Sequence, residues 1–276
     1  MTINSLLSTD KAEGDVPVAK AEALPLKGTK YLDPKFDEES QQQEPIATVI
    51  TEATVLENLG WDKETRRIFI RKVYSILAVQ LIASFAVCAF MALHQPTHVY
   101  VLTHAWPVVL SIFLSFLLIM TLMCYKDRSP QNMYLLAAFT FVEAFMVGTV
   151  TTAYAEENAK IVLEAVFLTG AIFIGLTVFT FQSKIDFSFL GAFLSMGLGA
   201  LLLWGVFAML FGIGTGYVYA LLGCIIFSGY ILFDTWLIMD KLNPHETVLA
   251  AIMLYLDIIN LFLYILQLLA SSDDRR

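Results

Sequence analysis

The chain has 276 residues, of which 58% are hydrophobic and 15% are charged, so it is far more apolar than an ordinary soluble domain. Most of its formal net charge of −8 lies before Arg66, and the rest of the chain is nearly neutral, as a bilayer-embedded body should be. The sequence has no basic patch with interleaved aromatic residues, which argues against nucleic acid as a partner. Its three cysteines show no metal-ligand spacing and are expected to be packing residues.

Residues 1–60 are polar, acidic and interrupted by prolines. Such a composition cannot bury enough apolar surface to offset the entropy lost when a chain becomes ordered. We therefore predict two parts, a disordered acidic cytosolic tail over residues 1–60 and a transmembrane domain over residues 61–272.

Seven apolar segments follow the tail, and each is long enough to cross the hydrocarbon core as a helix, which takes roughly 20 residues. They are Val73–Leu93, Ala105–Cys124, Met133–Tyr154, Ile161–Phe181, Phe187–Phe211, Tyr217–Met239 and Val248–Ala270. The links between them, such as His94–His104 and Glu156–Lys160, are short, which favours an up-and-down bundle. The predicted fold class is an all-α polytopic membrane protein with seven transmembrane helices. Close helix contacts are expected at the glycines of the later spans, Gly191, Gly197, Gly199, Gly223 and Gly229.

The distribution of lysine and arginine predicts the orientation of the bundle, because cytosolic loops carry an excess of both. A cytosolic N-terminus places most of them inside, namely Lys63, Arg66, Arg67, Arg71, Lys72, Lys126, Arg128, Lys184 and Lys241. The outer side then receives Lys160, Arg275 and Arg276. Seven crossings would make the C-terminus lumenal, unless the last segment re-enters the membrane.

Three ionisable residues lie inside the apolar segments, and such residues are costly and mark a functional site by default. They are Glu143, Asp234 and Asp257. The last two lie on neighbouring antiparallel segments at depths that differ by only about one helical turn, so their side chains could meet. Two carboxylates in one low-dielectric site cannot both ionise cheaply, and such a pair shares a proton.

An aspartate pair of this kind would be a pH sensor, a cation site or a catalytic dyad. The plainer alternative for each aspartate is a helix–helix hydrogen bond. Polar residues at helical spacing around the pair, Tyr230, Thr235, Tyr255 and Asn260, favour a site. For Glu143, a structural hydrogen bond and a possible cation site remain equal alternatives.

Several stretches resemble the transmembrane Bax-inhibitor-motif family (Bax inhibitor-1 / Lifeguard), and in particular its Lifeguard branch. The resemblance covers about residues 66–270 and includes the basic turn Cys124–Tyr134, the span around Glu143 in Phe139–Gly148, and the link Phe179–Phe187. Its most specific parts are Gly229-Tyr-Ile-Leu-Phe-Asp-Thr235 and Leu254-Tyr-Leu-Asp-Ile-Ile-Asn-Leu-Phe262.

The resemblance implies a seven-helix bundle whose C-terminal helix is central. It also implies a pH-sensitive calcium leak governed by Asp234 and Asp257, a location in endoplasmic reticulum, Golgi or vacuole, and a role in restraining cell death. The expected partners are the lipid bilayer, calcium ions, protons and cell-death regulators, and no cofactor is expected besides calcium as the permeant or bound ion. Bacterial relatives are thought to latch the pair with an arginine of the second span, and Trp106–Met123 contains no basic residue.

Other functions could use the same pair. An intramembrane aspartyl protease places one aspartate on each of two late helices, but it needs a Gly-x-Gly before the second aspartate and a later Pro-Ala-Leu, and neither is present. A proton-coupled transporter also stays open, although no inverted repeat supports it. A non-enzymatic calcium leak is therefore the leading hypothesis.

Overall fold

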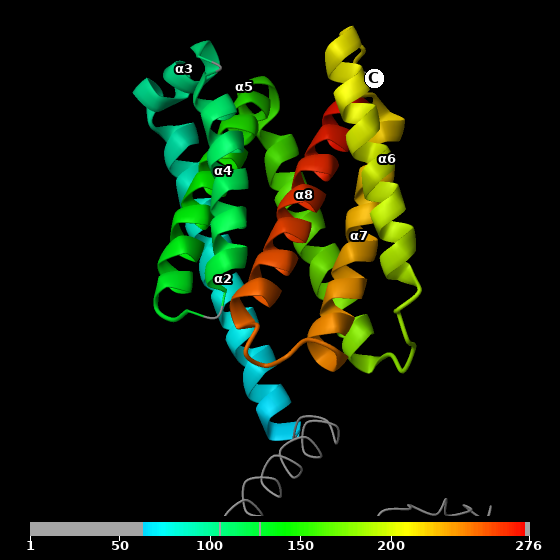
Figure 1. Ribbon diagram of the computed structural model, residues 1–276. Helices are drawn as coiled ribbons and strands as arrows, with labels where there is room; N and C mark the ends of the chain where they lie inside the picture. The colour runs from blue at the N-terminus through cyan, green and yellow to red at the C-terminus, as the bar shows by residue number, and fades with distance from the viewer. Residues whose placement is uncertain (1–62, 105, 127, 274–276) are drawn as a thin grey trace, which may run out of the picture. The chain divides into compact units, whose positions relative to one another are not determined.

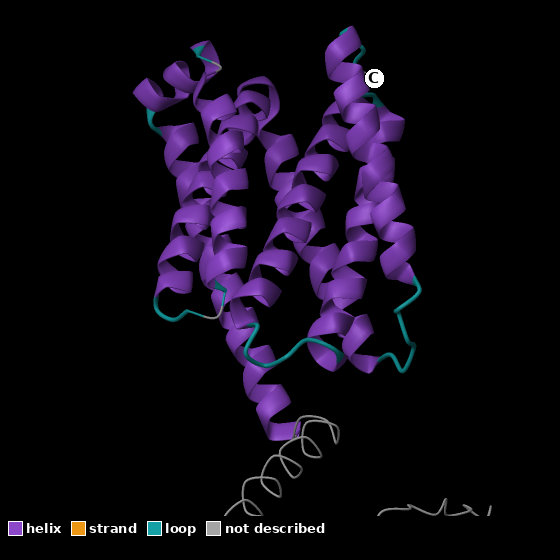
Figure 2. Cartoon of the chain, viewed as in Figure 1, coloured by secondary structure: helices purple, strands orange, loops and turns teal. Residues whose placement is uncertain are grey.

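The computed structural model describes residues 63–104, 106–126 and 128–273, which belong to one compact unit spanning Gly60–Arg276. The predicted acidic tail, residues 1–60, lies outside the described residues. Within the described ranges every regular element is an α-helix (Figure 2). This confirms the predicted all-α class.

The described part of the chain forms seven helices. They are α2 (Lys63–Leu93), α3 (Gln95–Thr103), α4 (Trp106–Tyr125), α5 (Gln131–Gln182), α6 (Leu190–Phe211), α7 (Tyr217–Asp240) and α8 (Thr247–Asp273). All of them except the short α3 are long and apolar enough to cross a membrane. Their apolar side chains are exposed on the outside of the bundle, as with Leu203 and Met209 of α6, which fits contact with lipid.

The longest helix, α5, contains two of the predicted spans. It has 52 residues and reverses at Asn158, whose backbone angles (φ −156°, ψ 92°) are not helical. Figure 1 shows its first half running to one end of the bundle and its second half returning. The side-chain oxygen of Asn158 accepts a hydrogen bond from the backbone N–H of Lys160 at 3.2 Å, as a residue that caps the start of a helix does. The six long helices therefore supply the seven predicted passes.

One predicted link was wrong, and one helix is longer than the span predicted for it. The link His94–His104 was expected to be a loop, but it carries α3, which starts with Pro96 in its first turn, where the missing N–H costs nothing. The first described helix, α2, contains the predicted span Val73–Leu93 and reaches back at least to Lys63. Lysine, arginine and glutamate are good helix formers, so the helix continues beyond its apolar segment into the polar region.

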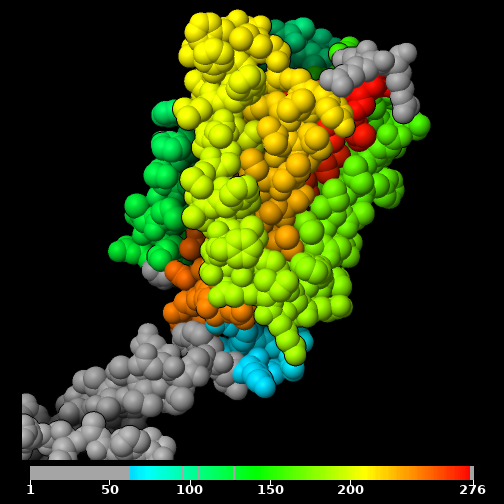
Figure 3. Space-filling view, turned by 90° about the vertical axis from the view of Figure 1, so that its right-hand side faces the viewer, coloured from blue at the N-terminus to red at the C-terminus, as the bar shows by residue number. Residues whose placement is uncertain are grey.

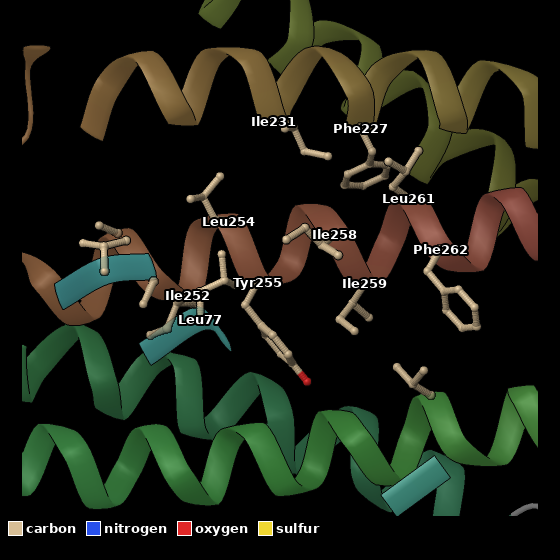
Figure 4. Packing of buried hydrophobic residues seen from close by; sticks show 14 of the residues in the cluster. Leu77, Phe227, Ile231, Ile252, Leu254, Tyr255, Ile258, Ile259, Leu261 and Phe262 are labelled. Carbon is tan, nitrogen blue, oxygen red and sulfur yellow. The ribbon is translucent and has the colours of Figure 1, made fainter. Parts of the chain in front are cut away.

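The last helix, α8, lies at the centre of the bundle. In its most apolar stretch 67% of the residues are buried, against 17–39% in the other spans. Figure 3 shows the end of α8, in red, between α7 and the second half of α5. In Figure 4, Leu254 and Leu261 lie on the side of α8 that faces α7, whereas Tyr255 points to the opposite side. The prediction of a central C-terminal helix is confirmed, and α8 runs the length of the bundle in Figure 1 instead of re-entering.

Glycines allow α7 to approach its neighbours closely. A methyl group at four of the five glycines expected in helix contacts would press on a side chain of the next helix, Gly191 on Phe233, Gly197 on Ile226, Gly223 on Tyr264 and Gly229 on Leu194. All four contacts involve α7. The prediction was wrong for Gly199, which has nothing within 4 Å of an added methyl group.

Basic side chains hold the turn between α7 and α8. Arg66 of α2 donates from Nη1 to the backbone oxygens of Ile238, at 3.2 Å, and Leu242, at 2.5 Å. Ile238 lies in the last turn of α7, where carbonyls have no partner within the helix, and Leu242 lies in the turn that follows. Lys126, after α4, pairs with Glu246 in the turn at 3.2 Å. The turn is therefore fixed from both α2 and α4.

Replacing Arg66 by alanine is expected to lower the free energy of unfolding by about 1–2 kcal/mol, because hydrogen bonds to a charged donor are lost from the end of α7. Thermal unfolding of the purified protein in detergent measures this. The control is Arg67→Ala, since Arg67 is exposed and pairs only with Glu64 on the helix surface among the interactions described. Equal losses for the two variants would show that the contact with α7 contributes nothing.

Candidate functional site

The last two long helices, α7 and α8, bring the two membrane aspartates together. Asp234 lies near the end of α7 that leads into the turn, and Asp257 lies on α8 after that turn. Both side chains are buried, with exposed fractions of 5% and 6%. The two carboxyl groups interact with each other through a side-chain hydrogen bond and through their charges. The sequence argument from helical depth had anticipated this contact.

One oxygen of the pair stays without a partner. Oδ2 of Asp257 is buried, and no described residue forms a hydrogen bond with it. An unpaired carboxylate oxygen in an apolar interior is costly unless it carries a proton or meets a cation. The pair can therefore hold a proton, a cation or a water molecule.

The side chains of the four polar residues expected around the pair have different partners. Tyr230 of α7 lies within electrostatic range of both aspartates. Tyr255 instead pairs its hydroxyl with that of Ser84 on α2 at 2.8 Å. Asn260 donates to the backbone oxygen of Leu256 at 2.8 Å, within its own helix. The fourth, Thr235, is directed toward Tyr74 of α2. Only Tyr230 among the four is placed to influence the pair directly.

Glu143 lies in a second polar cluster on the other side of α8. It is 5% exposed and accepts a hydrogen bond from Ser115 of α4. Its charge also acts on Tyr255, which belongs to the same side of α8. Among the described residues, no three His, Cys, Asp or Glu side chains form a group that could hold a metal ion. Glu143 therefore does not join Asp234 and Asp257 in one ligand set.

Sequence reasoning missed the part of this second cluster that comes from α2. Gln80 donates to Thr140 of α5 at 2.9 Å, and Ser84 binds Tyr255 as described above. Gln80 and Ser84 are four residues apart in an otherwise apolar span, so they share one face of the helix. That spacing was the signal that could have revealed the face of α2 that packs inward.

Comparisons with known proteins agree with this architecture. Residues 66–274 match the family model described as "Inhibitor of apoptosis-promoting Bax1". Bax inhibitor 1 of Schizosaccharomyces pombe is 39% identical over 215 residues, covering 77% of this chain and 79% of the relative.

Two further relatives have similar identity. Mouse protein lifeguard 4 is 42% identical over 213 residues, covering 76% of this chain and 87% of the relative. The Golgi anti-apoptotic protein of vaccinia virus strain Lister is 39% identical over 211 residues, covering 76% and 88%. With a family match over most of its length and relatives at this level of identity, the chain belongs to the Bax inhibitor and Lifeguard family of membrane proteins.

Proposed function

We propose that this protein is an endomembrane calcium leak whose conduction depends on pH through the Asp234–Asp257 pair, and that it restrains cell death by regulating stored calcium. The role in restraining cell death rests on the family, whose model is described as an inhibitor of apoptosis-promoting Bax1. The viral relative is named as a Golgi anti-apoptotic protein, which supports an endomembrane location. The calcium leak itself is proposed from the aspartate pair.

The observation that carries the proposal is the contact between two buried carboxyl groups inside a bundle of membrane helices. A proton shared by the pair holds α7 and α8 together, because it replaces repulsion between two carboxylates by a hydrogen bond. Loss or gain of a proton changes that contact. The pair thus couples the pH to the packing of the two helices.

Calcium is the cargo in this proposal and not a resident cofactor. Calcium takes six to eight oxygen ligands. Two aspartates supply at most four, and no described carboxylate, thiolate or imidazole forms a three-membered group with them. Such a site attracts a divalent cation without holding it tightly, as conduction requires.

The experiment is calcium flux into sealed liposomes that contain the purified full-length protein, followed with an enclosed calcium dye at several pH values. We expect flux above that of protein-free liposomes, with a rate that changes with pH. Flux that requires an opposing proton gradient would favour the proton-coupled transporter instead. Flux no greater than in protein-free liposomes at every pH would refute the leak.

A second prediction concerns orientation. In Figure 1 the start of α2, the α4–α5 turn, the α5–α6 link and the α7–α8 turn lie at one end of the bundle, and the basic residues are concentrated there. The excess of lysine and arginine on cytosolic loops supports a cytosolic N-terminus and a lumenal C-terminus. Protease treatment of sealed microsomes should remove an N-terminal tag and spare a C-terminal one. A protected N-terminal tag would reverse the orientation.

A further inference from the structure

Three buried hydroxyl groups from three helices meet between α2, the second half of α5 and α7. They belong to Tyr74 of α2, Thr177 in the second half of α5, and Thr235 of α7. Thr235 is fully buried and Thr177 is 8% exposed. The Tyr74 hydroxyl lies close to both threonine hydroxyls. Nevertheless, all three hydroxyl oxygens lack a hydrogen bond of ordinary geometry to any described residue.

The two threonines differ from their neighbours in the same bundle. A threonine inside a helix commonly donates to the carbonyl four residues earlier. Thr169 does so to Ala165 at 2.7 Å, and Thr180 does so to Leu176 at 2.8 Å. Both flank Thr177 on α5, so the helix allows that bond. The hydroxyls of Thr177 and Thr235 are directed to Tyr74 instead, which requires a partner there, because an unpaired hydroxyl in an apolar interior is costly.

The Tyr74 ring is fixed in place. It packs against Phe173 at 6.4 Å and Phe181 at 5.9 Å between ring centroids, both on the second half of α5. The phenol therefore cannot swing toward another acceptor without losing these contacts. Its hydroxyl remains directed at the two threonines.

The chemistry of the cluster selects the ligand. The three groups are neutral, and each can donate and accept one hydrogen bond or more. A cation would find no carboxylate among them. A buried water typically makes about three hydrogen bonds to polar groups that are otherwise unsatisfied, which is what this cluster offers.

We propose that Tyr74, Thr177 and Thr235 bind one structural water molecule that joins α2, α5 and α7. Thr235 directly follows Asp234, so the water fixes the face of α7 that is turned away from the pair. The site does not depend on calcium conduction, and its test uses no flux measurement.

The test is radiolytic labelling of the full-length protein in lipid, in which short X-ray pulses convert bound water to hydroxyl radicals that oxidise the nearest side chain. Mass spectrometry then measures oxygen added to Tyr74. We expect label on Tyr74 in the wild type despite the burial of its hydroxyl. The double variant Thr177→Val, Thr235→Val should lose most of it.

Two matched variants complete the experiment. Thr177→Ser with Thr235→Ser keeps both hydroxyls and should retain the label. Thr180→Val removes a hydroxyl from the same helix that bonds to its own backbone, and it should leave the label unchanged. Absence of label on Tyr74 in the wild type overturns the proposal even if the valine variant fails to fold. Equal label in the wild type and the folded valine variant overturns it as well.

Discussion

Replacing either Asp234 or Asp257 by asparagine is expected to abolish the pH dependence of calcium flux. Asparagine has nearly the shape of aspartate, but it cannot gain or lose a proton in this pH range. Since the two carboxyl groups interact with each other, removing one leaves the other without the partner that makes the proton shared. The measurement is the initial rate of dye-reported calcium entry at several pH values, for each variant in the same liposome preparation.

The control for these variants is Asp186→Asn, in the link between α5 and α6. The backbone N–H of Ser188 donates to Asp186 at 2.9 Å, and hydrogen bonds from Ser188 hold the pKa of that carboxyl below its usual range. Asp186 therefore stays ionised at neutral pH, and its removal should leave the pH profile unchanged. If Asp186→Asn flattened the profile as strongly as the pair variants, the effect could not be assigned to the pair.

Replacing Gly223 by alanine is expected to cause a large loss of stability. The added methyl group would overlap the Tyr264 ring of α8 near the root of the side chain, where rotation about the end of the side chain gives no relief. The ring is also confined by Phe227, stacked at 5.6 Å, and by Tyr219, whose hydroxyl is 3.3 Å from that of Tyr264. Overpacking of this kind costs about 1–3 kcal/mol.

Thermal unfolding in detergent measures the effect of Gly223→Ala, and Gly199→Ala is the matched control. Nothing lies within 4 Å of a methyl group at Gly199, so alanine there should be neutral or stabilising by up to about 1 kcal/mol. A wild-type unfolding temperature for Gly223→Ala would show that α7 and α8 can separate slightly without loss. Asp234 lies on α7 and Asp257 lies on α8. If these helices can separate without loss of stability, the proposal that the pair couples pH to their packing is weakened.

Much of the fold could be predicted because membrane spans are defined by length and apolarity alone. The passes were found in order, and the contact of Asp234 with Asp257 followed from their distances to one short turn. The prediction of the His94–His104 link failed because α3, with nine residues, is too short to give a hydropathy signal. The reversal at Asn158 lies within the predicted link Glu156–Lys160. The link is shorter than predicted, because the residues on both sides of Asn158 are helical.

The directions in which polar side chains point could not be predicted in the same way. A helix that is apolar all round gives no amphipathic stripe, so its rotation about its own axis is not readable. Thr235 and Tyr255 were both expected near the aspartates, and both point to α2 instead. The contact of Arg66 with the end of α7 was also not foreseen, because it joins residues more than 170 positions apart.

The measurement that tests the role of the pair most directly compares calcium entry into dye-containing liposomes across pH for three forms of residue 257. These are the wild type, Asp257→Asn and Asp257→Glu. Glutamate keeps a titratable carboxyl group and should retain a pH response, shifted in midpoint, whereas asparagine should give a rate that does not vary with pH. A wild-type pH response in the asparagine variant would contradict the account, because residue 257 would then not be the group through which pH acts.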